Sequence, residues 1–144
     1  MTRPFKWVWP VLSRPACLGA GLTTERSALS LGWPPAQSAE LSLVIVELST
    51  NAVRHGKDGV CTVELSAADA SVEVRDKGPG FPAWVLHGFS TSALLEHARP
   101  RELKARGLGA GLDVVKRLAT GLQLSNDAVV GGATARALIV RRMT

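Results

Sequence analysis

One stretch of the sequence, LSLVIVELSTNAVRHG (residues 41–56), limits what the chain can fold into more than any other. Its apolar residues recur with the period of an α-helix: Leu41, Val44, Ile45 and Leu48. Gly56 is a typical helix end, and the prolines of GWPP (residues 32–35) are typical of a first helical turn. We therefore predict a helix over residues 36–55 whose apolar face packs against a second layer of structure.

Shorter segments on both sides of this helix predict that second layer. Runs of alternating apolar residues predict strands, and apolar repeats of helical period predict two further helices. The expected strands are residues 6–11, 60–67, 71–76, 122–125 and 133–142, and the expected helices are residues 23–31 and 112–120. This order predicts an α/β (α+β) two-layer sandwich, with helices on one face of a mixed, mostly antiparallel sheet. We expect one domain over residues 23–144, preceded by a poorly defined segment, residues 1–22.

The composition argues against some classes of function. The 144 residues carry a net charge of +5 that is scattered along the chain, and aromatic residues make up only 5%. So few aromatic side chains give little material for stacking on single-stranded nucleic acid, and we expect no direct nucleic-acid partner. No apolar run approaches the ~20 residues that cross a bilayer, and the two cysteines lack metal-ligand spacing. We expect a cytoplasmic protein without membrane attachment.

The predicted helix over residues 36–55 also carries a polar stripe. Glu47, Asn51 and His55 are spaced four residues apart, so they share one face of the helix. An amide oxygen suits a hard cation such as Mg²⁺, and a carboxylate one turn away suits proton abstraction from a hydroxyl group. A solvated stripe on an amphipathic helix explains the same spacing, so the stripe alone does not decide between surface and site.

A second polar cluster, DKGPGF (residues 76–81), ends the predicted strand over residues 71–76. Gly78 and Gly80 allow the chain to turn and allow a flat ligand to approach the backbone closely. An ionised Asp76 accepts hydrogen bonds without donating any, which suits an amino group such as the N6 amine of adenine. An ordinary turn after a strand is the alternative interpretation.

A third cluster, RGLGAGL (residues 106–112), precedes the predicted helix over residues 112–120. It contains glycines at alternate positions: Gly107, Gly109 and Gly111. Small residues before a helix leave backbone N–H groups exposed, which suits phosphate, and Lys104 and Arg106 add positive charge. The pattern is neither a P-loop nor a dinucleotide fingerprint, and a flexible hinge is the alternative interpretation.

The order and spacing of the three clusters resemble those of one known family. The patterns are E-L-x-x-N-A-x-x-H on a helix, D-x-G-x-G after a strand and G-x-G-x-G-L at a helix start. They are similar to those of the GHKL (Bergerat-fold) ATP-binding domain of gyrase, Hsp90, MutL and histidine kinases. The segments ELSTNAVRHG, DKGPGFP and GLGAGLDVVKRLAT are most similar to small bacterial anti-sigma-factor serine kinases and the stressosome switch kinase. The resemblance covers about residues 23–142.

The resemblance implies that ATP and Mg²⁺ bind between the helices and the sheet. It implies Glu47 as general base, Asn51 as Mg²⁺ ligand, Asp76 as acceptor for the adenine amine, and residues 82–106 as a lid. The nucleotide-binding residues that it implies are Asn51, His55, Asp76, Gly78, Gly80, Lys104, Arg106, Gly107, Leu108, Gly109, Ala110, Gly111, Leu112 and Thr134. Two of these are open: His55 also fits a structural histidine at a helix end, and Thr134 follows G-A rather than the family's usual G.

The resemblance also implies a function, an ATP-dependent protein serine/threonine kinase that regulates transcription in a stress response by partner switching. The implied substrate is a serine of a STAS-type antagonist protein, and a sigma factor or other regulator and a second copy of the chain are further expected partners. One alternative is a nucleotide-binding module that sequesters a regulator without kinase activity. Another is a histidine-kinase-like ATPase domain. Glu47 favours a kinase over a pure binder, and the sequence before it offers no phospho-acceptor helix of the histidine-kinase type.

Overall fold

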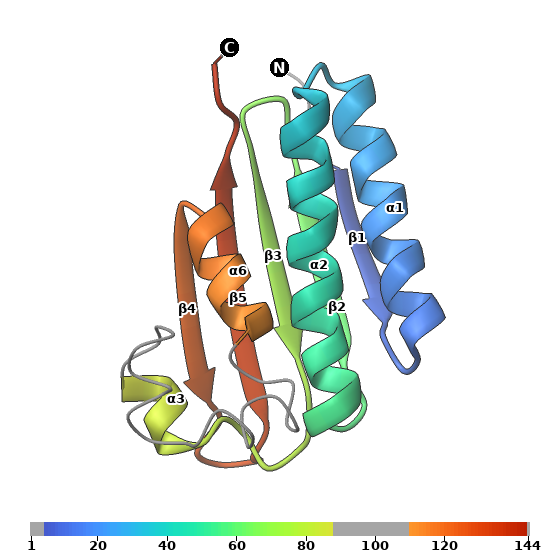
Figure 1. The fold of residues 1–144 in the computed structure, drawn as a ribbon. Coiled ribbons are helices and arrows are strands. Elements are labelled where there is room, and N and C mark those ends of the chain that lie inside the picture. The colour runs from blue at the N-terminus through green and yellow to red at the C-terminus, as the bar shows by residue number, and fades with distance from the viewer. Residues whose placement is uncertain (1–4, 88–109, 144) are drawn as a thin grey trace.

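The computed structural model describes residues 5–87 and 110–143, which form one sheet covered by helices (Figure 1). The elements in chain order are β1 (Phe5–Pro10), α1 (Arg14–Ser30), α2 (Pro35–His55), β2 (Val60–Leu65), β3 (Asp69–Arg75), α3 (Ala83–His87), α6 (Ala110–Leu118), β4 (Gly121–Asn126) and β5 (Ala133–Val140). Among these helices, none has the length and apolar character that a membrane span requires.

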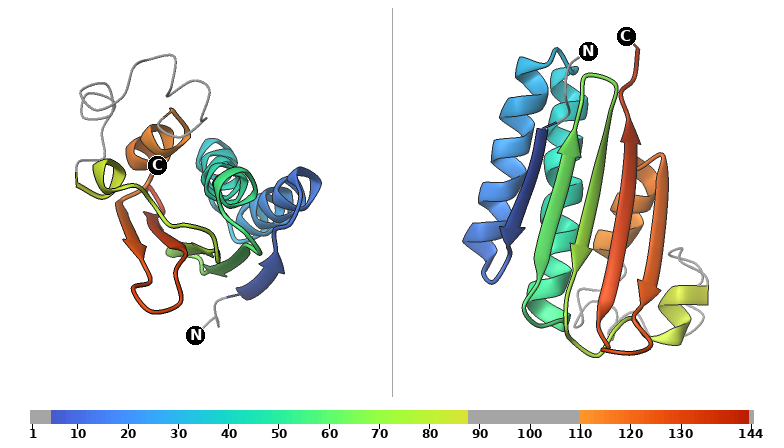
Figure 2. Two further views of the ribbon diagram at one scale, coloured as in Figure 1. Left: turned by 90° about the horizontal axis from the view of Figure 1, so that it is seen from below. Right: turned by 180° about the vertical axis from the view of Figure 1, so that it is seen from behind.

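The five strands form a single sheet in the order β1-β2-β3-β5-β4, and every neighbouring pair is antiparallel. β2 and β3 form the expected hairpin, with Cys61 opposite Val74. β5 lies between β3 and β4, so that Ala135 is opposite Val74 on one side and Leu124 on the other. α1, α2 and α6 cover one face of the sheet, and the opposite face is open (Figure 2). The predicted two-layer α+β fold is confirmed, with antiparallel pairing throughout the described strands.

The helix α2 lies at the centre of the helical layer. It begins at the expected prolines, and it ends where the Gly56 N–H donates to the Ala52 carbonyl (3.0 Å). Its predicted core face is fully buried: Leu41, Val44, Ile45 and Leu48. The same buried cluster contains alternate residues of β2 and β3: Cys61, Val63, Leu65, Ala70, Val72 and Val74. Removing these side chains from water is what holds α2 on the sheet.

Both cysteines lie in this core and neither forms a disulfide. Burial raises the pKa of the Cys61 thiol to about 11, so the thiol stays protonated at neutral pH. A protonated, wholly buried thiol is a poor nucleophile, and Cys61 acts here as a small hydrophobic residue.

The helix α1 corrects the prediction for the first part of the chain. It begins at Arg14 rather than at residue 23, because Ser13 caps it by accepting a hydrogen bond from the Ala16 N–H (3.4 Å). The expected strand over residues 6–11 is confirmed as β1, which pairs with β2 at the edge of the sheet. Ordered structure therefore reaches well into the segment that the sequence left undefined.

The start of α1 escaped prediction because its buried positions carry small or polar side chains, which give no apolar stripe. These positions are Cys17, Ala20, Gly21, Thr24 and Ala28. Small residues allow close packing of helices, and Gly21 is a point of close approach to α2. A Cβ added to Gly21 would lie 2.7 Å from Oγ of Ser42.

Other differences concern the segments around the third sequence cluster. The helix α6 begins at Ala110 rather than at residue 112, and α3 was not predicted. Residues 88–106 of the expected lid lie outside the described residues.

Two substitutions on α2 test whether this helix anchors the fold. Ile45 is 0% exposed and Leu43, on the same helix, is 40% exposed. We predict that Ile45→Ala lowers the free energy of unfolding by about 2–5 kcal/mol, because it leaves a cavity in the core. The control Leu43→Ala should change it by less than about 1 kcal/mol, since the side chain is already largely in water. Urea unfolding followed by circular dichroism measures both, and equal losses would contradict the proposed core.

Candidate functional site

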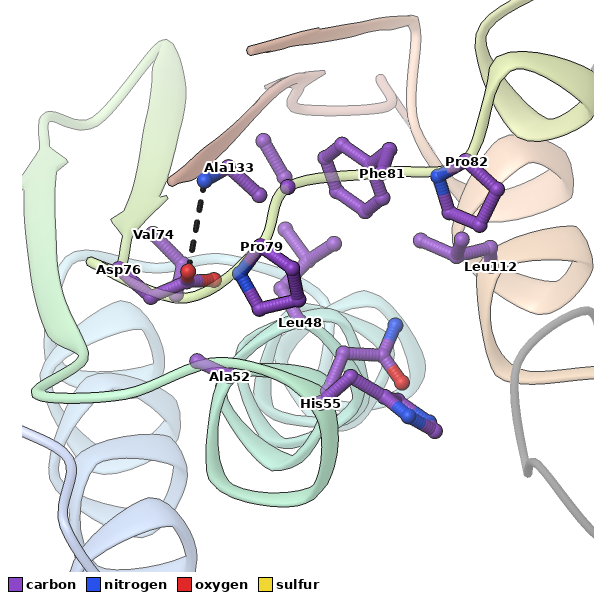
Figure 3. Close-up of a pocket in the computed structure, with 13 residues that line it drawn as sticks. Leu48, Ala52, His55, Val74, Asp76, Pro79, Phe81, Pro82, Leu112 and Ala133 are labelled. Atoms are coloured by element: carbon purple, nitrogen blue, oxygen red, sulfur yellow. Dashed lines mark hydrogen bonds between the residues drawn. The ribbon is translucent and has the colours of Figure 1, made fainter. Parts of the chain in front are cut away.

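A cavity of about 260 Å³ lies between α2 and the sheet, beside the carboxyl end of β3 (Figure 3). We call it the α2 pocket. Its apolar lining includes Leu48, Val74, Pro79, Phe81, Leu112 and Ala135. Its polar side chains are Asn51, His55 and Asp76. The pocket therefore joins the first two sequence clusters to Leu112, a residue of the third, although 61 positions separate Asn51 from Leu112 in the sequence.

Among the described residues that line this pocket, Asp76 is the one carboxylate. Its Oδ1 accepts hydrogen bonds from the N–H groups of Gly78 (2.8 Å) and Ala133 (3.3 Å), the second of which is drawn in Figure 3. Its own N–H donates to the Ala133 carbonyl (3.0 Å). Its Oδ2 accepts no hydrogen bond from any residue that the structure describes. The carboxylate is thus fixed in place through one oxygen, and its second oxygen is left for a ligand that donates a hydrogen bond.

Gly56, which the sequence predicted only as a helix end, and Gly132 make room for Asp76. A Cβ on Gly56, at the end of α2, would collide with the Asp76 carboxylate. A Cβ on Gly132, before β5, would collide with the Asp76 backbone carbonyl, and the φ of Gly132 is +99°. Three connections of the chain therefore meet at one carboxylate. No motif signalled Gly56 or Gly132, because their role depends on contacts between distant segments.

The predicted polar stripe of α2 borders the pocket. Asn51 is 8% exposed, and its Nδ2 has no hydrogen-bond partner among the described residues. His55 also lines the pocket one turn further on, with Nε2 enclosed by protein. A buried amide without a partner costs free energy unless a ligand or water satisfies it, so Asn51 marks a place for a polar ligand group.

Glu47 lies beside the pocket rather than in its lining. Its carboxylate lies against Gly111 in the first turn of α6, where it leaves no room for a side chain on that glycine. The structure thus brings together Glu47 of the first cluster and Gly111 of the third. Ala110 and Leu112 belong to the same turn of α6. Lys104, Arg106, Gly107, Leu108 and Gly109 lie outside the described residues.

Among the predicted site residues that the structure describes, Thr134 is the one that lies on the face of the sheet opposite the pocket. Successive residues of a strand point to opposite faces, and Ala133 and Ala135 are the residues of β5 that line the pocket. Thr134 instead lies on the open face with Arg75 and Ser125, its neighbours on β3 and β4. In the sequence G-A-T, the residue that faces the pocket is Ala133. The expected contact between Thr134 and adenine is therefore wrong.

The residues present fit a nucleotide in type and arrangement. Phe81, Pro79 and the two alanines of β5 offer apolar surface to a flat ring, and Asp76 offers an acceptor at one end. Asn51 offers an amide oxygen of the kind that Mg²⁺ takes as a ligand. This arrangement is suited to a flat ring that donates a hydrogen bond to Asp76, with a metal-binding amide beside it.

A family model and one solved structure support the fold described above. The family model described as "Histidine kinase-, DNA gyrase B-, and HSP90-like ATPase" matches residues 36–140. A chain in the crystal structure of the SiaB–SiaC complex from Pseudomonas aeruginosa has a TM-score of 0.60 at 16% identity, over 95% of this chain and 90% of that one. The mycobacterial sensor histidine kinase MprB gives 0.47 at 21% identity, over 74% of each chain. No curated protein matches the sequence.

A glycine substitution tests the packing around Asp76. The φ of Gly56 is −107°, which any residue can adopt, so the cost of a side chain there comes from the carboxylate alone. We predict that Gly56→Ala lowers the free energy of unfolding by about 1–3 kcal/mol, because Asp76 must move. The control Gly121→Ala, in β4, meets no atom within 4 Å and should stay within about 0.5 kcal/mol. A Gly56→Ala protein as stable as the control would show that Asp76 is not held as described.

Proposed function

The chain belongs to the family of histidine kinase-, DNA gyrase B- and HSP90-like ATPases, and from this premise we propose that it is a protein serine/threonine kinase that uses MgATP bound in the α2 pocket. The family model covers residues 36–140, which include α2, Asp76, the start of α6 and β5. The observation that carries the proposal is the carboxylate of Asp76, held through one oxygen and open through the other at the end of an apolar pocket.

The pocket supports adenine as the base. Oδ2 of Asp76, which accepts no hydrogen bond from the described residues, would accept one from an exocyclic amine, which adenine has at position 6. Phe81 and Pro79 offer apolar surface in the lining, and the small side chains of Ala133 and Ala135 leave room for a ring. Gly78 and Gly80 keep the backbone between them close to the base. A carbonyl oxygen at the same place, as in guanine, would face the carboxylate without a proton between them.

The phosphates and Mg²⁺ are assigned to the part of the site between α2 and the start of α6, where Glu47 lies against Gly111. Asn51 supplies a ligand for Mg²⁺, which neutralises charge on the phosphates when bound. Ala110, Gly111 and Leu112 begin α6, and backbone N–H groups at a helix start suit phosphate oxygens. By resemblance, the segment before α6 supplies further phosphate contacts: Lys104, Arg106, Gly107, Leu108 and Gly109. His55, at the pocket rim, is left as either a nucleotide contact or a structural residue.

Glu47 is assigned as the general base. It lies one helical turn before Asn51 on the same face of α2, so its carboxylate is next to the proposed metal ligand. In the reaction it accepts the proton of a serine hydroxyl while that oxygen attacks the γ-phosphorus, and ADP leaves with the bridging oxygen. Phosphoryl transfer depends mainly on positioning and charge neutralisation, which these few groups can provide.

The substrate we propose is a serine of a STAS-type antagonist protein, with a sigma factor or another regulator as second partner. The motifs ELSTNAVRHG and GLGAGLDVVKRLAT carry this assignment through their resemblance to anti-sigma-factor kinases. A chain of similar fold was crystallised in a two-protein complex, SiaB–SiaC, which supports a search for a protein partner. The competing proposal is a module that binds nucleotide and sequesters a regulator without phosphorylating it. The presence of Glu47 beside Asn51 favours the kinase, since a pure binder has no use for a base.

Replacing Asp76 tests the nucleotide site. We predict that Asp76→Asn weakens MgATP binding about tenfold or more, because a charged acceptor of the amine is lost. The control Asp69→Asn removes a carboxylate at the other end of the same strand and should leave the affinity unchanged. Isothermal titration calorimetry measures both proteins. Wild-type protein that shows no heat of binding and no thermal shift with MgATP would contradict the proposed function outright.

Replacing Glu47 tests the chemistry separately from binding. We predict that Glu47→Gln binds MgATP within about twofold of wild type but transfers γ-phosphate about 10²-fold more slowly or worse, because the general base is lost. Glu40→Gln, two turns earlier on α2, removes a carboxylate that pairs with Arg142 and should transfer phosphate normally. The assay follows radiolabelled γ-phosphate onto a STAS-type partner. Wild-type protein that binds ATP but labels no such partner would favour the sequestering module instead.

A further inference from the structure

Asn126, the last residue of β4, holds the loop that follows β3. Its Oδ1 accepts a hydrogen bond from the Phe81 N–H (2.7 Å), and its Nδ2 donates to the Phe81 carbonyl (2.8 Å). The two residues are 45 positions apart in the sequence. The side-chain amide therefore pairs with the Phe81 backbone as a neighbouring strand would, although no strand lies there.

The contact requires glycine next to Phe81. Gly80 has a φ of +87°, and a Cβ added to it would lie 2.8 Å from Cγ of Asn126. The amide group thus packs flat against the loop backbone at Gly80 while it bonds to Phe81. This complementarity fixes both the position and the direction of the loop over residues 79–82.

The loop that Asn126 fixes is one wall of the α2 pocket. Pro79, Gly80, Phe81 and Pro82 all line the pocket, and Figure 3 shows Pro79 and Phe81 following Asp76 along one side. Asn126 itself is not part of that lining. It borders a groove on the open face of the sheet instead. Any effect of Asn126 on a ligand must therefore pass through the position of Phe81 and its neighbours.

We propose that Asn126 is a positioning residue that sets the affinity of the α2 pocket for the nucleotide base. It does so by holding the pocket wall formed by residues 79–82 at a fixed distance from the sheet. The inference rests on the proposed function, because it names the residue that adjusts the same site. The two hydrogen bonds lie in an exposed region, so water can replace them when the amide is removed. Loss of the amide should therefore free residues 79–82 to move while changing the free energy of unfolding only slightly.

The test separates base binding from phosphate binding. Asn126→Ala should weaken MgATP binding about tenfold, while its affinity for inorganic tripolyphosphate, measured by competition, stays within about twofold of wild type. Asn126→Asp keeps an acceptor for the Phe81 N–H but has no donor for the Phe81 carbonyl. Its MgATP affinity should therefore fall between those of wild type and Asn126→Ala. If Asn126→Ala fails to fold, the MgATP and tripolyphosphate affinities of Asn126→Asp test the inference in its place. Gln123→Ala, on the same strand and bordering the same groove, is the matched control and should bind both ligands normally.

The outcomes are distinguishable. MgATP affinity unchanged in Asn126→Ala would overturn the inference and leave the proposed function standing. Equal weakening of MgATP and tripolyphosphate would also overturn it, because a general loss of structure affects both ligands alike. A wild-type protein that binds no MgATP would overturn the proposed function, and this inference with it.

Discussion

The site depends on the close packing of three chain connections around the carboxylate of Asp76. Each connection contributes a glycine that leaves no space for a side chain: Gly56 after α2, Gly78 after β3 and Gly132 before β5. A Cβ on Gly56 would collide with the Asp76 carboxylate, one on Gly78 with the Gly56 backbone, and one on Gly132 with the Asp76 backbone carbonyl. Two backbone N–H groups then fix Oδ1, and Oδ2 accepts no hydrogen bond from the described residues. The carboxylate is positioned before any ligand arrives, so binding need not spend free energy to order it.

The helix α2 connects this packing to the rest of the fold. One face carries Leu41 and Ile45 into the core, and the adjacent face carries Glu47 and Asn51 toward α6 and the pocket. Because both faces belong to one rigid helix, the burial that holds the fold together also sets the spacing of the polar groups. The buried amide of Asn51, without a partner among the described residues, is a cost that a ligand at this position would remove.

The sequence predicted the parts of this structure that repeat or that form local motifs. The period of α2, the alternation of β2 and β3, and the Asp76 cluster were all readable, because each depends on neighbouring residues. The start of α1 was not, because helices packed through small residues such as Gly21 leave no apolar stripe. Thr134 was assigned to the pocket but lies on the opposite face, because side chains of successive strand residues point to opposite faces and the assignment was off by one residue. The contacts of Gly56 with Asp76 and of Asn126 with Phe81 were not predicted, because they join segments that are distant in the sequence.

The central claim is that a nucleotide base binds against Asp76 inside the α2 pocket. Amide chemical shifts of ¹⁵N-labelled protein during a titration with MgATP test it most directly. We predict the largest shifts at Gly78 and Ala133, whose N–H groups donate to Asp76, and little change at Thr62 and Ser71 on other parts of the sheet. Shifts that spare Gly78 and Ala133, or that concentrate at Thr62 and Ser71, would contradict it.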